Sequence, residues 1–190
     1  MREHEINNSN TFIMGWYIEE SVCDYLVNYY NSESVFKEQG LSRNNKVDKD
    51  MKDSIDARIP PNTIELQDYL SELKKCSDLY YQRYNASSGS RGYSIKESIN
   101  IQHYKIGGGF KLWHSERSSA DPYIRDRHLV FMTYLNDVED GGTDFLYQCL
   151  TVKAEKGLTL IWPADWTHTH KGQISNTKEK TIVTGWFSYI

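Results

Sequence analysis

Two helical patterns mark the first half of the chain. In residues 19–30 the apolar positions recur at i, i+3, i+4 and i+7, one face of an amphipathic helix, at Val22, Tyr25, Leu26 and Tyr29. A second helix is predicted after residues 62–63, which can cap it, with an apolar stripe of Leu66, Tyr69, Leu70, Leu73, Cys76 and Tyr80. Residues 40–62 are polar and predict a long loop, and residues 85–90 predict a flexible stretch between the two halves.

The second half has the shorter period of β-strands. Apolar and polar residues alternate in residues 95–104, and β-forming residues dominate residues 128–136. Turns are expected at the glycines 107–109 and at the Asp-Gly-Gly sequence 140–142. Four more strands are predicted, at residues 110–116, 158–162, 167–170 and 180–189. Short strands separated by glycine turns indicate a β-sandwich or barrel.

These elements predict an α+β protein, mainly β, with helices packed outside a β-core. The length of 190 residues fits one domain, residues 1–190, with a helical support region at 1–90 and a β-core at 91–190. The sequence leaves the oligomeric state open.

The composition narrows the range of partners. The chain has 22 basic and 26 acidic residues, a net charge of −4, so we expect no nucleic-acid or membrane surface, which would favour a concentrated basic face. No apolar run approaches the ~20 residues that span a bilayer, and the first residues lack the apolar stretch of a signal peptide. Three scattered cysteines, Cys23, Cys76 and Cys149, fit buried, reduced thiols in a cytoplasmic protein.

The candidate chemistry lies in two short segments. His114 and Glu116 are two positions apart, so on an extended segment both side chains point to one face. In the predicted strand 167–170, His168 and His170 share a face in the same way, and one of them is a candidate third ligand. Two histidines and one carboxylate hold Fe(II) on one side and leave positions open for a cosubstrate and O2. Alone, the His-x-Glu pair is better explained as two unrelated polar residues near a turn, and the histidines of residues 167–170 are what favours a metal site. His4 is expected in a disordered tail, and His103 and His128 in structural positions.

The motifs of residues 95–190 resemble those of a known family. They are Y-K-I-G-G-G-F-K-L-W-H-S-E, T-Y-L-N-D with E-D-G-G-T-D-F, K-G-L-T-L-I-W-P, H-K-G and K-T-I-V-T-G-W. Their order and spacing are similar to those of the Fe(II)/2-oxoglutarate-dependent dioxygenases, in particular the prolyl 4-hydroxylase-like group with its short bacterial and phage members. The resemblance implies a double-stranded β-helix (jelly-roll) core.

The resemblance also assigns residues. His114 and Glu116 match the first metal pair, and His170 is preferred over His168 because Lys180 follows it by ten residues and Trp186 by a further six, as in the family. Glu116 departs from the family's usual aspartate. The cosubstrate residues implied are Lys180 for the distal carboxylate of 2-oxoglutarate, with Thr184, Tyr134 and Tyr104 around it.

The function implied is hydroxylation of a C–H group in a peptidyl residue, using Fe(II), 2-oxoglutarate and O2 and releasing succinate and CO2, with ascorbate as a further candidate reductant. Three alternatives remain: an oxygenase acting on a free amino acid or other small molecule, a non-catalytic metal-binding jelly-roll, and a zinc hydrolase, although the chain lacks the H-E-x-x-H motif common in that class. The loop 40–62 and residues 117–127 are expected to flank the site entrance.

Overall fold

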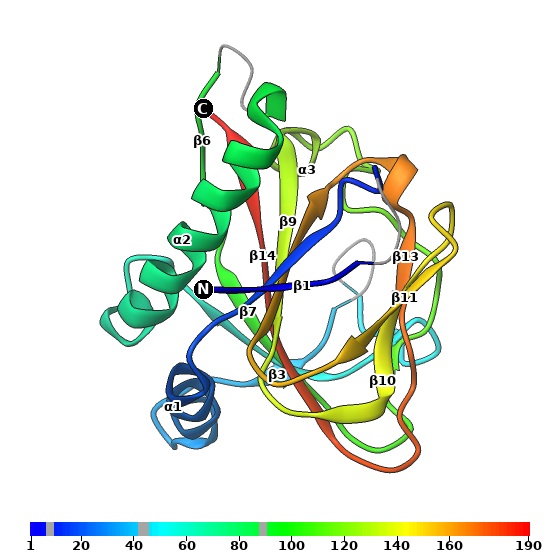
Figure 1. The fold of residues 1–190 in the computed structure, drawn as a ribbon. Coiled ribbons are helices and arrows are strands. Elements are labelled where there is room, and N and C mark those ends of the chain that lie inside the picture. The colour runs from blue at the N-terminus through cyan, green and yellow to red at the C-terminus, as the bar shows by residue number, and fades with distance from the viewer. Residues whose placement is uncertain (7–9, 42–45, 88–90) are drawn as a thin grey trace.

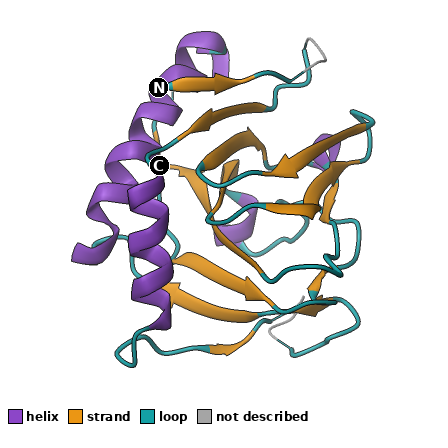
Figure 2. Cartoon of the chain, turned by 60° about the horizontal axis from the view of Figure 1, so that its bottom comes forward, coloured by secondary structure: helices purple, strands orange, loops and turns teal. Residues whose placement is uncertain are grey.

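The two long helices of this computed structural model cover one face of a large antiparallel sheet, and a smaller sheet lies on the other side (Figures 1 and 2). The structure describes residues 1–6, 10–41, 46–87 and 91–190. In Figure 1, α1 and α2 stand on one side of strands β7, β9 and β14, while β10, β11 and β13 stand on the opposite side. This arrangement is the jelly-roll fold implied by the sequence motifs.

The elements of the first half are β1 (Arg2–His4), β2 (Met14–Tyr17), α1 (Glu20–Asn31), β3 (Glu38–Gln39), β4 (Lys52–Asp53), β5 (Ile55–Ile59), the 3-10 helix η2 (Ile64–Leu66), α2 (Gln67–Arg83) and η3 (Asn85–Ser87). Those of the second half are β6 (Tyr93–Ser94), β7 (Ile99–Tyr104), β8 (Gly109–Phe110), α3 (Pro122–Arg125), β9 (Arg127–Tyr134), β10 (Val138–Phe145), β11 (Leu150–Ala154), β12 (Leu158–Pro163), η4 (Trp166–His168), β13 (His170–Gly172) and β14 (Lys180–Tyr189).

Within the described residues, the large sheet has nine strands in the order β1-β2-β12-β9-β14-β7-β5-β3, with β6 beside β14. The smaller sheet has the order β11-β10-β13, and β4 pairs with β8. Strand β14 is central to the large sheet, since it pairs with β9 over Ile182–Ser188 and with β7 over Lys180–Thr184. Every second residue of β14 therefore lies beside a residue of β7 and a residue of β9 whose side chains point to the same face of the sheet.

The two predicted helices are present, and one of them is rotated relative to expectation. The predicted stripe of α2 is buried at Tyr69, Leu73, Cys76 and Tyr80. In α1 the buried residues are Cys23, Leu26 and Tyr30, and Tyr25, which the pattern placed on the buried face, is 50% exposed. Val22 and Tyr29 are partly buried against the core, as predicted. Tyrosine can occupy either face of a helix, so the periodicity included Tyr25 in error.

Strands from the first half extend the large sheet, which the sequence pattern did not predict. The expected loop 40–62 contains β4 and β5, and β5 pairs with β7 through the sheet; residues 42–45 of that loop lie outside the described residues. His4 is in β1, where its Nδ1 is 2.7 Å from the Tyr17 hydroxyl, rather than in a disordered tail. In the expected flexible stretch, residues 85–87 form η3, and residues 88–90 are not described.

Three local predictions in the second half were wrong. The Asp-Gly-Gly sequence 140–142 is not a turn but lies inside β10, where the pairing register with β11 shifts between Val138 and Thr143. Of the predicted strand 110–116, only Phe110 belongs to a regular strand, and His114 pairs with His170 as an isolated bridge. The predicted strand 167–170 is instead the 3-10 turn η4 followed by β13. All three cysteines are free, but Cys149 is exposed rather than buried.

Two hydrophobic clusters hold the layers together. The first joins the helices to the large sheet and includes Leu26, Tyr69, Leu73, Ile101 and Phe131. The second lies between the two sheets and includes, among others, Val130, Tyr134, Phe145, Trp162 and Ile182. Odd residues of β9 serve the first cluster and even residues the second, as the two-residue period of a strand requires. Among the described residues, no helix is long and apolar enough to cross a membrane.

Substitution Gly142→Ala is expected to lower the free energy of unfolding by about 1–3 kcal/mol, because the added Cβ would lie 2.3 Å from the backbone oxygen of Val152 in β11. The matched control is Gly172→Ala on the paired strand β13, where the nearest atom would be 3.6 Å away; there we expect a change within about 1 kcal/mol. Urea unfolding of both variants measures the difference. Equal stability of the two would contradict the close approach of β10 and β11 at Gly142.

Candidate metal centre and cosubstrate pocket

A cavity of about 630 Å³ opens between the two sheets. Strands β7, β9 and β14 supply one wall through side chains that share a face, including Gln102, Met132, Tyr134 and Lys180. The opposite wall comes from β8, β10 and β13, and the segment between β8 and α3 brings His114 and Glu116 to its edge. The cavity therefore collects every residue for which the motifs implied a role with metal or cosubstrate.

His114, Glu116 and His170 converge on one point of the cavity wall. One potential ligand atom from each lies within 4.8 Å of the others. Glu116 Oε1 is 3.2 Å from His114 Nε2 and 3.6 Å from His170 Nε2. The isolated bridge between His114 and His170, with backbone hydrogen bonds of 2.8 and 3.0 Å, brings the two histidine residues side by side despite a sequence separation of 56 residues.

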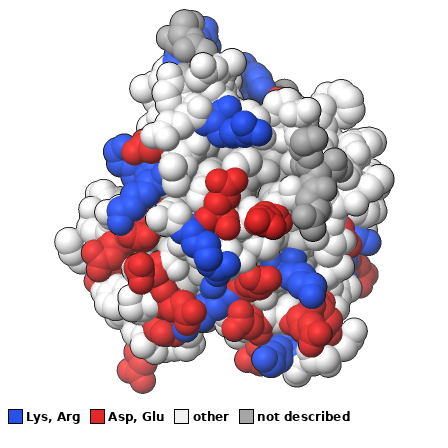
Figure 3. All heavy atoms as spheres, in the orientation of Figure 1, with Lys and Arg blue, Asp and Glu red and all other residues white. Residues whose placement is uncertain are grey.

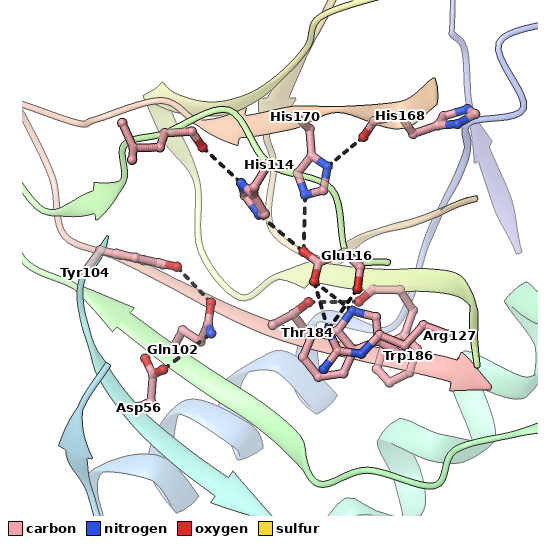
Figure 4. Close-up of polar contacts among 12 residues, drawn as sticks. Asp56, Gln102, Tyr104, His114, Glu116, Arg127, His168, His170, Thr184 and Trp186 are labelled. Atoms are coloured by element: carbon pink, nitrogen blue, oxygen red, sulfur yellow. Dashed lines mark hydrogen bonds and ion pairs between the residues drawn. The ribbon is translucent and has the colours of Figure 1, made fainter. Parts of the chain in front are cut away.

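Backbone carbonyls orient both imidazoles (Figure 4). Nδ1 of His114 is 3.0 Å from the oxygen of Leu112, and Nδ1 of His170 is 2.9 Å from the oxygen of His168. Because a carbonyl accepts only, each Nδ1 carries the proton and donates it, which leaves Nε2 of each ring directed toward Glu116. A metal-binding histidine is commonly held in this way, with one ring nitrogen donating to a carbonyl and the other free to coordinate.

The second oxygen of Glu116 has its own partners. Glu116 Oε2 accepts from the Trp186 indole Nε1 at 3.1 Å and lies 3.3 Å from Nη1 of Arg127. In Figure 4 the carboxylate stands between the two imidazoles on one side and these two groups on the other. The two carboxylate oxygens therefore face different surroundings.

The charge state of the cluster follows from these contacts. Burial raises the pKa of the Glu116 carboxyl, but hydrogen bonds and charge interactions with His114 and His170 outweigh it and hold that pKa well below its usual range. Burial, together with the nearby His114, lowers the pKa of His170. A hydrogen bond from either Nε2 to the carboxylate needs a proton between them, and a divalent cation placed among the three atoms would replace it. This donor set fits Fe(II).

Lys180 is a buried cation at another part of the same cavity. Its Nζ donates to the backbone oxygens of Gly141 at 2.7 Å and Gln173 at 2.8 Å, and among the described residues no carboxylate lies within ion-pair distance of it. Burial lowers its pKa to about 8, although Asp140 and Asp144 partly oppose the shift. A buried ammonium without a paired anion is costly, and an anionic ligand in the cavity would relieve that cost. The residues present thus fit both a divalent metal and a dicarboxylate.

The other predicted cosubstrate residues lie at different distances from Lys180. The Lys180 ammonium is 5.5 Å from the centre of the Tyr104 ring, and the Tyr104 hydroxyl donates to Gln102. The Tyr134 hydroxyl is 2.6 Å from that of Thr143. Thr184 lines the cavity but lies four strand residues from Lys180, roughly 13 Å along β14. The assignment of Thr184 to the cosubstrate stays a prediction. At this distance, Thr184 is better placed to contact a cosubstrate near the metal cluster than to share the carboxylate held by Lys180.

The remaining histidines lie apart from the cluster. His168 is buried on η4, and its Nε2 is 2.8 Å from the oxygen of Thr11, so the ring points away from His170. Figure 4 shows the two side chains directed to opposite sides of their segment. Nδ1 of His103 is 3.0 Å from the hydroxyl of Thr181, and the ring of His128 stacks on Tyr189. These are structural environments, as predicted for His103 and His128.

Several cavity residues were missed from the sequence. Thr143, next to Tyr134, lies in the segment mistaken for a turn. Gln102 accepts from Tyr104 and approaches the buried pair of Asp56 and Lys52, whose strands were taken for a loop. Arg127 begins β9, and the alternation of that strand would turn it toward the helices with Leu129. The pairing of β9 with β14 shifts register at this point, which turns Arg127 into the cavity.

Comparison with known proteins places residues 99–188 in a family and identifies structures with the same fold. Residues 99–188 match the family model described as the 2OG-Fe(II) oxygenase superfamily. The comparison with curated proteins gave no match. Among solved structures, the viral collagen prolyl hydroxylase of Paramecium bursaria chlorella virus 1, in complex with 2-oxoglutarate, has 17% identity and a TM-score of 0.71, covering 95% of this chain and 98% of its own.

Two further structures have the same fold. A Trichoplax adhaerens prolyl hydroxylase in complex with a peptide fragment of the hypoxia inducible factor oxygen degradation domain has 16% identity and a TM-score of 0.73, over 94% of this chain and 84% of its own. A Pseudomonas putida prolyl-4-hydroxylase has 14% identity and a TM-score of 0.66, over 95% and 94%. Residues 99–188 thus match the 2OG-Fe(II) oxygenase superfamily, and the chain has the fold of the prolyl hydroxylases; together these findings support a dioxygenase.

Proposed function

We propose that this dioxygenase hydroxylates a C–H group of a peptidyl residue, with His114, Glu116 and His170 holding Fe(II) and Lys180 holding the distal carboxylate of 2-oxoglutarate. The observation that carries the proposal is the pairing of two features in one cavity: a cluster of three ligand atoms within 4.8 Å, and a buried lysine that has no carboxylate partner among the described residues. The charges of a metal and a dicarboxylate complement these two features.

Bound Fe(II) supplies O2 activation, coupled to oxidation of 2-oxoglutarate to succinate and CO2. The chain's own residues bind and orient. The two imidazoles and Glu116 occupy one side of the metal position, so the coordination positions toward the cavity stay available. Lys180 anchors the far end of the cosubstrate, and Tyr104 and Tyr134 line the space around it. Ascorbate is proposed as a reductant that keeps the iron in the ferrous state.

Three observations support a peptidyl substrate. The cavity volume of about 630 Å³ is in the range of pockets that bury a drug-sized ligand, so room remains beside a small cosubstrate. Asn100, directly across from Thr184, lines the cavity, and its amide has no hydrogen-bond partner in the part of the chain that the structure describes. A carboxamide can pair with both groups of a peptide bond. One structural neighbour was solved with a peptide.

Surface charge gives no preference for a polyanionic substrate on the face in Figure 3. Acidic side chains there are interspersed with basic ones, and no extended basic region stands out.

The direct test is mass spectrometry of proline-rich peptides incubated with the protein, Fe(II), 2-oxoglutarate and ascorbate. A Pro-Pro-Gly repeat peptide and free L-proline are the first two probes. The expected result is the gain of one oxygen atom by the peptide, in step with succinate release. Oxidation of free proline alone would favour a small-molecule oxygenase. Succinate release with neither probe oxidised would contradict a prolyl substrate.

The histidine assignment predicts different outcomes for two neighbouring substitutions. His170→Ala should abolish high-affinity Mn(II) binding, because it removes one of three ligand atoms. His168→Ala should keep Mn(II) affinity within about threefold, since its ring contacts Thr11 and its backbone oxygen still orients residue 170. Electron paramagnetic resonance of free Mn(II) measures both. Loss of binding in the His168 variant, with binding retained in the His170 variant, would reverse the assignment.

The lowered pKa of Lys180 predicts pH-dependent cosubstrate binding. With its pKa at about 8, the ammonium is charged below that pH and loses its charge as the pH rises through it. The affinity for 2-oxoglutarate, measured by calorimetry with Mn(II) present, should therefore fall by up to about tenfold per pH unit above pH ~8. Lys180→Arg should remove this dependence, because arginine stays charged.

Lys180→Ala should weaken 2-oxoglutarate binding most below pH ~8, where the wild-type ammonium is charged, while Lys178→Ala, at an exposed position in the same segment, should not. Unchanged binding in the Lys180→Ala variant would disprove the contact.

A further inference from the structure

We propose that Arg127 and Trp186 form a clamp that adapts this metal site to a glutamate ligand, by holding Oε2 of Glu116 so that Oε1 alone faces the metal position. Both act as positioning residues, through Glu116. The inference rests on the proposed metal site.

The clamp has three contacts to one residue. Nη1 of Arg127 lies 3.3 Å from Glu116 Oε2 and donates to the Glu116 backbone oxygen at 3.2 Å. Trp186 Nε1 donates to the same Oε2 at 3.1 Å. Oε2 thus has a cationic and a neutral donor, whereas the polar partners of Oε1 among the described residues are the two imidazoles. The side chain is held at both its backbone and its carboxylate.

Arg127 is itself rigidly placed. Its Nε and Nη2 donate to the two carboxylate oxygens of Glu97 at 2.8 and 2.5 Å, a bidentate pair. Its guanidinium carbon lies 3.4 Å from the centre of the Trp186 ring. The Arg127 side chain is only 11% exposed. Because Glu97 and Trp186 already fix the guanidinium, little further conformational entropy is lost when it holds Glu116.

A glutamate ligand needs such a restraint more than an aspartate does. It has one more rotatable bond, and a free carboxylate can bind a metal through both oxygens, which would occupy a position needed by cosubstrate or O2. With Oε2 engaged by two donors, Glu116 offers a single oxygen. The side chain also has the length to lie between clamp and imidazoles. An aspartate, shorter by one C–C bond of ~1.5 Å, cannot keep both sets of contacts.

A double-substitution cycle on metal affinity tests the clamp. The probe is Mn(II), titrated without cosubstrate and followed by electron paramagnetic resonance. Arg127→Gln should weaken Mn(II) binding by about 10-fold or more, as expected when a group that orients a ligand is lost. Glu116→Asp should also weaken it, although aspartate is the family's usual residue. In the Glu116→Asp background, Arg127→Gln should cost less than about twofold, because the clamp no longer has its target.

Two further variants serve as a control and as a second test of the clamp. Arg125→Gln removes an exposed arginine two residues away, whose side chain contacts Asp126 and not the cluster, and should leave Mn(II) affinity unchanged. Trp186→Phe removes the Nε1 donor but keeps a ring beneath Arg127, and should give a smaller loss that also disappears with Glu116→Asp. If thermal unfolding shows that Arg127→Gln does not fold, the Trp186→Phe cycle decides the question.

The outcomes separate the clamp from the metal site. Equal fold-losses for Arg127→Gln in the wild-type and Glu116→Asp backgrounds, or no loss in the wild-type background, would overturn the clamp while leaving the proposed function intact. Absence of Mn(II) binding by the wild-type protein would overturn the metal site itself. Strong coupling between positions 116 and 127 is the result that the geometry leads us to expect.

Discussion

The Glu116 carboxylate is the group around which the site is arranged, because both of its oxygens need partners in a largely buried position. Its side chain is 16% exposed, and it meets two imidazoles on one side and an indole and a guanidinium on the other. These four partners come from different parts of the chain: the segment after β8, β9, β13 and β14. An unpaired carboxylate here would be strongly destabilising. Satisfying this one anion therefore ties the smaller sheet to the larger.

Lys180 is the complementary charge of the cavity. It shares a face of β14 with Thr184 and Trp186, so one strand carries the proposed cosubstrate anchor near one end and a partner of the proposed metal ligand Glu116 near the other. The ammonium is held by two carbonyls and no carboxylate among the described residues. An active site gains when charged groups are fixed before the ligand arrives, since no reorganisation is then needed. The lowered pKa of Lys180 reflects the cost of that arrangement.

The sequence predicted the parts of the structure that follow a regular period. Both long helices, and strands β9, β12 and β14, were located within a few residues, and the motif spacing brought His114, Glu116, His170 and Lys180 to one cavity. The predictions that were wrong concern segments without a regular period. The stretch 140–142 has the sequence of a turn, yet Gly142 allows a close approach of β10 to β11, which only the paired strand reveals. Short strands such as β1, β3 and β4 depend on partners distant in the sequence, so no local pattern marks them.

The contact between Arg127 and Glu116 combines a register shift in β9 with a departure from the family's usual metal ligand. Regular alternation would direct its side chain toward the helices, and a register shift between β9 and β14 directs it to Glu116 instead. Read alone, glutamate at position 116 is a departure from the family's aspartate, and nothing in the motif explains it. With Arg127 and Trp186 beside the second oxygen, the additional methylene gives Glu116 the length to reach these two donors and the two imidazoles at once. In the proposed clamp, Glu116, Arg127 and Trp186 therefore act as one unit, and the departure at position 116 is explained by its two partners.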